Sequence, residues 1–301
     1  MTSTPAWDLY HSLLAVLQEG SLSGAARRLG LKQPTIGRHI DTLEKGLGIT
    51  LFTRSPEGMT PTDAALELRP YAENMASLAD AILRNASAPA NDIHGTVRVS
   101  ASDVVGAEVL PPILTRLHEA HPELSIELVL SNRPDDLLRR EADIAIRMFR
   151  PVQGALLARR IGDIALGLHA RRDYLDRRGR PKTFADLRTH TLIGFDKESA
   201  FIRSMRDRGL PLKRDMFALR TDSDLAQLAA IRAGYGIGVC QVPLARRSDD
   251  LVQVLAKTFA FPLETWVVMH EDLRNTPRCR AVFDALADGL ADYVKSPRLA
   301  D

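Results

Sequence analysis

Glycines divide the first fifty residues into three short segments of helical periodicity. Apolar residues recur at helical spacing from residue 7 to residue 49, and the interruptions are Gly20, Gly30, Gly46 and Gly48. The second segment runs from about Leu22 to Leu29, and the third runs from about Gln33 to Lys45. Helices this short are marginal in water by themselves. We therefore expect a compact unit in which three helices share one small core.

A short hairpin is expected directly after the third helix. Residues 49–54 alternate between apolar and polar side chains, residues 55–58 (SPEG) have the composition of a turn, and Met59 and Thr60 resume an extended course. Three helices followed by such a hairpin form a winged unit, which we assign to residues 1–60.

Residues 61–90 carry the spacing of a helix that packs on a partner along its length. Tyr71, Met75, Leu78 and Ile82 follow one another at steps of four, three and four, the a and d positions of a coiled coil. We interpret this segment as a linker and dimerisation helix, and the alternative is a helix that lies on its own domain. Pro70 is expected to remove a hydrogen bond or to kink the helix.

The rest of the chain alternates strands with helices after a small, polar linker over residues 86–95. Such alternation predicts a mainly parallel, doubly wound sheet. The expected strands are 96–100, 125–130, 142–147, about 162–170, 191–195, 216–221, 237–242 and 265–270, and the expected helices are 104–118, 134–141 and one that begins at Thr276-Pro277.

We expect these elements to form one α/β domain, residues 91–301, with two lobes. Lobe I comprises about residues 91–162 and 269–301, and lobe II comprises about residues 163–268, so the chain crosses between the lobes twice. Sheets of this kind bind ligands in a cleft outside the carboxyl ends of their strands.

The overall charge of the chain says little about its partners. Forty Lys and Arg residues against 38 Asp and Glu residues give a net charge of +2, so any affinity for nucleic acid must come from locally placed charge. Residues 27–54 hold six basic residues against two acidic ones, a balance of six minus two, or +4. They are Arg27, Arg28, Lys32, Arg38, Lys45 and Arg54 against Asp41 and Glu44.

Composition also limits compartment and chemistry. Cys240 and Cys279 cannot supply a disulfide framework or a four-ligand zinc site, and the first 26 residues hold no Lys or Arg of a secretory signal. No run approaches the about 18 apolar residues of a membrane span. The sequence contains neither G-x-S-x-G nor H-E-x-x-H. We expect a cytoplasmic protein that is not an enzyme and has no cofactor or metal site.

The connection between the second and third helices, residues 30–32, is that of a helix-turn-helix, whose later helix inserts its N-terminal side chains into the major groove. By itself, this segment is also compatible with a solvated surface helix. Its core-facing residues are Ile36, Ile40 and Leu43, and the polar residues able to bond base edges or phosphates are Gln33, Thr35, Arg38 and His39.

The order of these motifs resembles LysR-type transcriptional regulators. The matching residues are GSLSGAARRLG at 20–30, QPTIGRHI at 33–40, Leu43-Glu44, Leu47-Gly48, Leu51-Phe52, Arg54, ADIAI at 142–146 and AGYGIG at 233–238. The family implies a winged helix-turn-helix, a long linker helix and a two-lobed effector domain similar to periplasmic binding proteins. It also implies that the chain binds double-stranded DNA as a homodimer or homotetramer and responds to a small-molecule effector.

The resemblance assigns roles to single residues. Gln33, Thr35 and Arg38 would face the groove, Pro34 would lie in the first turn of the helix, and Arg54 would approach a phosphate or the minor groove. Lys32 and His39 complete the expected DNA-binding set.

Two positions depart from the family pattern. Gly37 stands where a serine is usual, which costs about 1 kcal/mol of helix propensity. Lys32 stands where a serine commonly caps the helix, and a lost cap costs about 1 kcal/mol. We hypothesise that either a DNA phosphate offsets the Lys32 cation or this helix becomes fully ordered only on DNA.

Polar residues at the ends of the expected strands are candidates for effector binding, and together they could clamp a carboxylate. The set is Ser102, Asp103, Ser131, Arg147, Thr221, Asp222 and Ser223. The alternatives are helix capping by the Ser, Thr and Asp residues and an internal partner, Asp143 or Asp103, for Arg147. The competing function is a cytoplasmic sensor or solute-binding protein that does not bind DNA.

Overall fold

Within the described part of the chain, two compact units form, one of residues 5–86 and one of residues 93–295. The computed structural model describes residues 5–55, 58–86, 93–132, 142–151, 156–198, 200–207 and 212–295.

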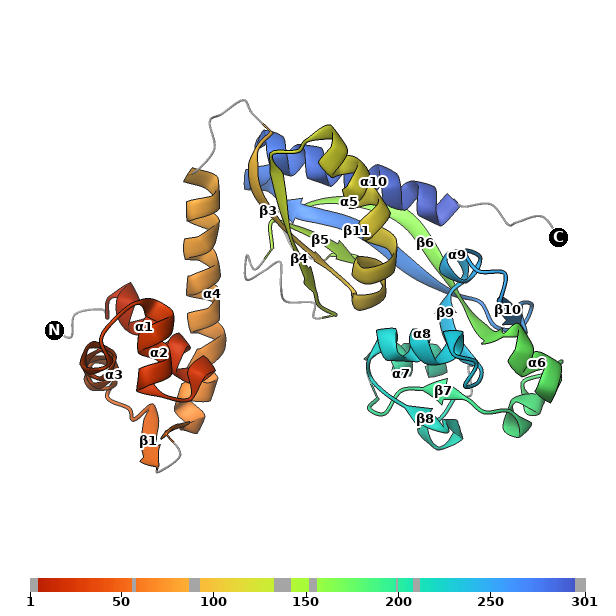
Figure 1. Ribbon diagram of the computed structural model, residues 1–301, viewed down its shortest axis with the longest axis horizontal. Helices are drawn as coiled ribbons and strands as arrows, with labels where there is room; N and C mark the ends of the chain where they lie inside the picture. The colour runs from red at the N-terminus through yellow and green to blue at the C-terminus, as the bar shows by residue number, and fades with distance from the viewer. Residues whose placement is uncertain are drawn as a thin grey trace. The chain divides into compact units, whose positions relative to one another are not determined.

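The first unit consists of the three expected helices, the hairpin and the long helix (Figure 1). Its elements are α1 (Trp7–Glu19), α2 (Leu22–Leu29), α3 (Gln33–Leu47), β1 (Phe52–Ser55), β2 (Gly58–Pro61) and α4 (Asp63–Ala86). Gly20, Gly30 and Gly48 end the first three helices with φ of 66°, 65° and 70°, the left-handed conformation that glycine adopts without a Cβ penalty. Gly46 lies inside α3, which therefore extends two residues beyond its expected end.

The apolar spacing correctly predicted the core of this unit. Leu13 of α1, Ala25 of α2, and Ile36 and Leu43 of α3 are fully buried. Ser21 begins α2 as its N-cap, because its hydroxyl accepts a hydrogen bond from Gly24 N at 3.1 Å. Packing of these three short helices on one another supplies the stability that none of them has alone.

The long helix α4 runs through Pro70 and presents an apolar stripe to solvent. Ala65 and Ala72 are buried in the unit's core, whereas Tyr71 and Ile82 are both 68% exposed. Met75 and Leu78 are exposed on the same stripe. Isolated exposed apolar residues are ordinary, but a row of them at coiled-coil spacing is not.

The second unit is an α/β domain (Figure 1). Its strands are β3 (Gly95–Ala101), β4 (Leu124–Leu130), β5 (Ile144–Arg147), β6 (Leu156–Arg171), β7 (Ile193–Gly194), β8 (Leu219–Arg220), β9 (Gly238–Gln241), β10 (Leu251–Val254) and β11 (Phe261–His270). Its helices are a π-helical turn η1 (Val105–Val109), α5 (Leu110–Ala120), α6 (Arg172–Arg178), α7 (Ala200–Asp207), α8 (Asp224–Arg232), α9 (Val242–Ala245) and α10 (Pro277–Lys295), with short 3-10 turns η3 (Ala185–Thr189), η4 (Arg214–Met216) and η5 (Glu271–Leu273).

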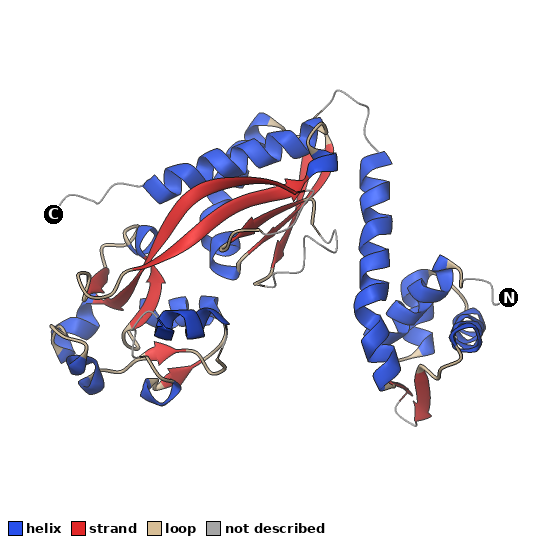
Figure 2. Ribbon diagram, turned by 180° about the vertical axis from the view of Figure 1, so that it is seen from behind, coloured by secondary structure: helices blue, strands red, loops and turns tan. Residues whose placement is uncertain are grey.

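The expectation of a mainly parallel sheet was wrong. The main sheet has the order β10-β6-β11-β5-β3-β4, with β9 also paired to β6. Only β4, β3 and β5 run parallel within it, and the pairs made by β6, β9, β10 and β11 are antiparallel. The cause is that β6 and β11 are long strands that lie side by side and cross between the lobes in opposite directions, as Figure 2 shows.

Each lobe has its own helices, and one apolar core includes residues of both lobes. In lobe I, α5 and α10 pack on the sheet and share a core with its strands, including Ile113, Val97 and Phe283. Lobe II contains α6 to α9 and a small parallel pair, β7 with β8, which is much shorter than the two strands expected there. The helix expected over residues 134–141 lies outside the described residues. Among the described residues, no helix has the length and apolar character needed to cross a membrane.

Candidate functional site

The N-terminal half of α3 exposes a polar face opposite its buried apolar face. Lys32, Gln33, Pro34 and Arg38 are exposed, and Thr35 is half-buried. The opposite face packs into the core of the unit through Ile36, Ile40 and Leu43. One face of α3 thus holds the fold together, and the opposite face is open to a partner.

His39 differs from the other predicted DNA-contacting residues. Its Nδ1 lies 2.8 Å from the hydroxyl of Ser12, a buried residue of α1, and Ser12 Oγ also donates to Asp8 O at 2.9 Å. The structure therefore ties the His39 ring to α1, whereas Gln33 and Arg38 stay open to solvent.

The hairpin β1–β2 forms the wing. Arg54 lies on β1, where it pairs with Met59 of β2, and its side chain lies outside the described residues. The carboxylate of Glu44, on α3, accepts hydrogen bonds from the main-chain N–H groups of Leu51 at 2.6 Å and Phe52 at 3.2 Å. Sequence reasoning counted the charge of Glu44 and listed Leu43-Glu44 among the residues that match the family, but it did not predict this contact.

A cleft of about 960 Å³ lies within the second unit and is large enough for a small organic molecule. Most of its lining is apolar, and Phe195 and Phe217 meet edge to face in its wall with ring centroids 5.0 Å apart. The polar and charged lining residues are Ser102, Ser131, Asn132, Arg147, Lys197, Glu198, Arg206, Asp222, Asp224, Gln227, Gln241 and Glu264.

Four of the seven predicted effector residues line this cleft, namely Ser102, Ser131, Arg147 and Asp222. The other three make local contacts at strand and helix ends. Ser223 caps α8 by accepting from Ala226 N at 3.3 Å, Thr221 Oγ1 accepts from Ser223 N at 3.2 Å, and Asp103 contacts Asn132.

Arg147 ends β5 with a guanidinium that is buried in the wall of the cleft. The residue is 4% exposed, and it donates to Ile146 O and to Ser100 Oγ, each at 3.1 Å. A buried guanidinium is expensive to desolvate, so these acceptors hold it in place.

Polar contacts join the two lobes, and sequence reasoning missed them. Asn132 of lobe I donates to Asp224 of lobe II at 3.4 Å. Desolvation by the surrounding protein, together with the nearby Asp103 carboxylate, raises the pKa of Asp224. Arg232 at the end of α8 donates to both carboxylate oxygens of Glu108, at 2.6 and 2.8 Å, and this hydrogen bonding lowers the pKa of Glu108.

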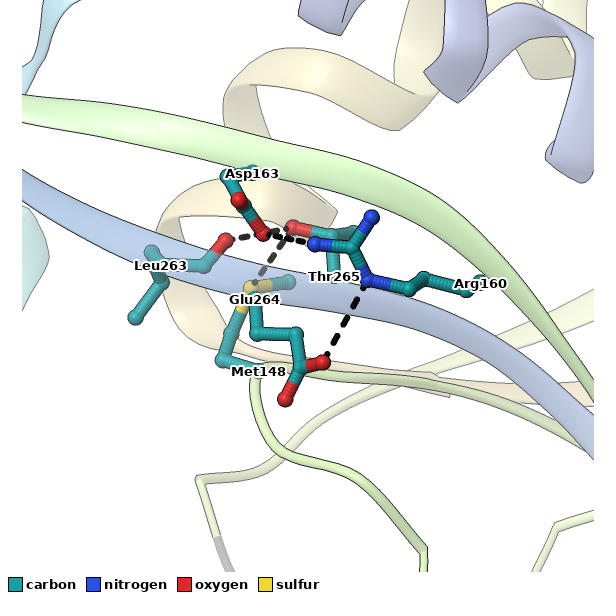
Figure 3. A network of polar contacts seen from close by, with 6 residues as sticks. All are labelled: Met148, Arg160, Asp163, Leu263, Glu264 and Thr265. Atoms are coloured by element: carbon teal, nitrogen blue, oxygen red, sulfur yellow. Dashed lines mark hydrogen bonds and ion pairs between the residues drawn. The ribbon is translucent and has the colours of Figure 1, made fainter.

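The crossing strands carry an irregularity next to the cleft. The register of β6 against β11 shifts between Thr265 and Trp266, opposite Gly162, which has φ of 146°. Figure 3 shows Arg160 reaching both Asp163, at 2.7 Å, and Glu264, at 3.3 Å. Glu264 of β11 also lines the cleft, so one of these ion pairs holds a side chain of the cleft lining.

Comparison with known proteins gives the family. The model of the LysR substrate binding domain matches residues 90–291, and the model of the bacterial regulatory helix-turn-helix protein, lysR family, matches residues 7–66. The chain belongs to the LysR family. It is a LysR-type transcriptional regulator that joins a helix-turn-helix region to an effector-binding region.

Individual relatives agree with this assignment. The probable HTH-type transcriptional regulator LtrA of Klebsiella pneumoniae is 25% identical over 91% of this chain and 91% of its own. The full-length virulence activator AphB of Vibrio cholerae has a TM-score of 0.61 at 22% identity, covering 94% of this chain and 99% of AphB. Full-length CbnR, solved in complex with its target DNA, has a TM-score of 0.66 at 20% identity, with the same coverage. These solved structures share the fold of the regulator.

The regulator's two departures from the family pattern are accommodated differently. Lys32 occupies the N-cap position of α3, where an ammonium group has no lone pair with which to accept from the first amides. Gly37 is open: among the described atoms, the nearest to an added Cβ would be Leu22 Cδ1 at 3.8 Å, an ordinary contact. A steric clash therefore does not explain why glycine occupies position 37.

Proposed function

We propose that this LysR-family regulator binds double-stranded DNA as a homodimer or homotetramer and changes its activity when a small molecule occupies the cleft. The observation that carries the proposal is the face of α3 that exposes Gln33 and Arg38 beside a half-buried Thr35. It acts as a regulator and not as a catalyst, and it acts in the cytoplasm, where its DNA target lies.

The major groove is the target of α3. Amide and guanidinium groups such as those of Gln33 and Arg38 make bidentate contacts with adenine and guanine edges. Lys32, at the uncapped helix end, contacts a phosphate, and Arg54 on the wing approaches a phosphate or the minor groove. Thr35 is half-buried and His39 contacts Ser12, so these two residues contribute less to DNA binding than Gln33 and Arg38.

The α4 stripe supports the oligomer. Tyr71, Met75, Leu78 and Ile82 project an apolar row from a helix whose other face holds the unit together. A second copy of the helix would cover that row. Two-fold pairing would also present two α3 helices to two half-sites, as helix-turn-helix dimers do.

The cleft receives the effector. Its volume and apolar lining suit a small organic molecule, and Ser102, Ser131 and Arg147 are the candidates for holding a carboxylate on it. Asp222 is held in place by the main-chain N–H groups of Lys197 and Asp196, which donate to it at 2.8 and 3.0 Å and lower its pKa. Asp222 therefore fixes the backbone at Asp196 and Lys197. We do not assign it a contact with a carboxylate of the effector, because two negative charges repel each other.

The DNA proposal is tested by a gel shift on a duplex enriched from random-sequence DNA by the unaltered protein. Replacement of Arg38 by alanine is expected to weaken binding about tenfold or more, which corresponds to the loss of one base contact. Arg98→Ala is the matched control, because Arg98 is an exposed arginine of the second unit that pairs with Glu127. Equal binding by the two variants would contradict the assignment of α3.

A further inference from the structure

One carboxylate attaches the wing to α3. Glu44 lies one turn before the end of α3, and its Oε1 accepts from both Leu51 N and Phe52 N. The main-chain oxygen of the same residue accepts from Gly48 N at 2.8 Å and from Ile49 N at 3.2 Å. Glu44 therefore holds the connection between the helix and β1 at four points.

The side-chain part of this contact is specific to a hydrogen-bond acceptor. Leu51 is fully buried and Phe52 is 6% exposed, so their N–H groups lie where a lost acceptor is not easily replaced by water. Bonds to an ionised carboxylate are also stronger than bonds to a neutral oxygen.

The second strand of the wing is anchored elsewhere. Met59 N donates to Gly20 O at 2.9 Å, in the turn between α1 and α2. A Cβ at Gly58 would lie 2.6 Å from the same Gly20 oxygen, so the two backbones touch. The Met59 contact thus attaches β2 to the α1–α2 turn, whereas the Glu44 contact attaches β1 directly to α3.

We propose that Glu44 is a positioning residue for DNA binding, because it sets the place of β1, and with it Arg54, relative to the exposed face of α3. The inference rests on the proposed function. A wing contact and a groove contact have to form together on one duplex, and such pairs of contacts need a supporting residue that fixes their separation.

Charge alone makes the opposite prediction. Glu44 is one of two acidic residues in the basic segment 27–54, and an acid near a phosphate backbone weakens binding. The other acid, Asp41, lies on the same helix and is exposed. If Glu44 acted only through its charge, its removal would strengthen binding as much as removal of Asp41.

The test compares Glu44→Met, which keeps the length but loses the acceptor, with Glu44→Gln, which keeps an acceptor and loses the charge. Asp41→Asn is the charge control. Hydroxyl-radical footprints and salt dependence are measured on the duplex enriched by the unaltered protein. For Glu44→Met we expect about tenfold weaker binding, lost protection where the wing lies, and a salt slope smaller by about 0.9, the share of one phosphate.

Dimethyl sulfate, which methylates guanine N7, probes the major groove of the same duplex, and there Glu44→Met is expected to keep its protection of guanines. Glu44→Gln keeps both protections, and Asp41→Asn binds at least as tightly as the unaltered protein. Hydrogen exchange gives an independent readout. The Leu51 and Phe52 amides of Glu44→Met are expected to exchange about tenfold faster than those of Glu44→Gln.

Wing protection and salt slope that are unchanged in Glu44→Met would overturn the inference. Loss of the whole footprint in proportion to the unfolded fraction, measured by urea titration, would also overturn it, because Glu44 would then serve folding alone. Arg38→Ala separates the two proposals. If that variant binds normally, the proposed function fails, whereas weakening by Arg38→Ala without an effect of Glu44→Met defeats only the positioning role.

Discussion

His169 is an ionisable residue at a place where ionisation is penalised. It lies on β6, is 1% exposed, and has its Nδ1 3.0 Å from Gly167 O. Burial lowers its pKa to about 4; the Gly167 carbonyl opposes this shift and the Arg246 cation adds to it. Strand alternation does not predict such a residue, because the sequence shows neither the second layer that covers β6 nor the cation beside it.

The depressed pKa of His169 makes stability depend on pH. The unfolded chain takes up a proton near pH 6.5, whereas the folded chain resists it until about pH 4, so this contribution is complete above pH 6.5 and is lost as pH falls toward 4. We expect a loss of about 2 kcal/mol in unfolding free energy between about pH 7.5 and about pH 5. Urea titration at both pH values measures it, and His169→Gln should lack this part of the loss.

Residue-scale prediction from the sequence succeeded for α3 and was less informative at its edge. Helical spacing identified Ile36, Ile40 and Leu43 as buried and Gln33 and Arg38 as exposed. His39 lies at the border between the two faces, where spacing does not say whether a side chain turns toward solvent or toward a neighbouring helix.

At the scale of elements, α3 has destabilising residues at its N-terminus and in its interior. Lys32 leaves the helix without a side-chain cap, and Gly37 lies in its interior. Glycine in a helix interior is about 1 kcal/mol less favourable than alanine. An added Cβ fits at Gly37, so an alanine there would raise the helix propensity of α3 without disturbing its packing.

Replacement of Gly37 by alanine is therefore expected to stabilise the first unit by about 0.5–1 kcal/mol. Urea unfolding followed by the fluorescence of Trp7, with Trp266 changed to phenylalanine, measures the effect. Gly48→Ala is the matched control. No described atom lies within 4 Å of a Cβ at Gly48, but its φ of 70° strains any other residue, so this variant should lose stability. A gain in both variants would refute the argument.

In the second unit, the positions of the strands along the sequence were predicted better than their parallel or antiparallel course. Strand positions follow from short apolar runs, and β3, β4 and β5 lie close to the expected ranges. Strand direction depends on whether the chain turns back after crossing between the lobes. No sequence pattern indicates that β6 continues for 16 residues from one lobe into the other. Thr221 and Ser223 were expected to help clamp a carboxylate, but their hydroxyl groups accept hydrogen bonds at the start of α8.

At the scale of the whole molecule, the exposed apolar row on α4 indicates that the protein assembles into an oligomer. A heptad-like row needs a partner helix, and the described residues of the first unit do not cover it. The spacing alone predicted this row, because a and d positions are counted along one helix and need no knowledge of tertiary structure. The cleft required the folded domain, since its lining comes from many separate segments.

We expect the double variant Tyr71→Asp with Ile82→Asp to dissociate the assembly. Both side chains are 68% exposed, and burial of two carboxylates in an apolar interface should raise the dimer dissociation constant about 100-fold or more. Sedimentation velocity measures the change. Arg69→Ala, which alters the charge on another face of α4, is the control and should sediment as the unaltered protein does. An unchanged mass for the double variant would place the interface elsewhere.

The antiparallel course of β6 and β11, which carries the chain into lobe II and back, has a consequence for the rate at which the second unit folds. Lobe I is completed by α10, whose Val282 and Phe283 pack in one core with Val97 of β3, almost 190 residues earlier in the chain. Closing so long a loop is slow, since non-local pairing has to offset its entropy first. The helical unit of residues 5–86 is built from near neighbours and needs no such closure, so we expect it to fold faster than the effector-binding unit.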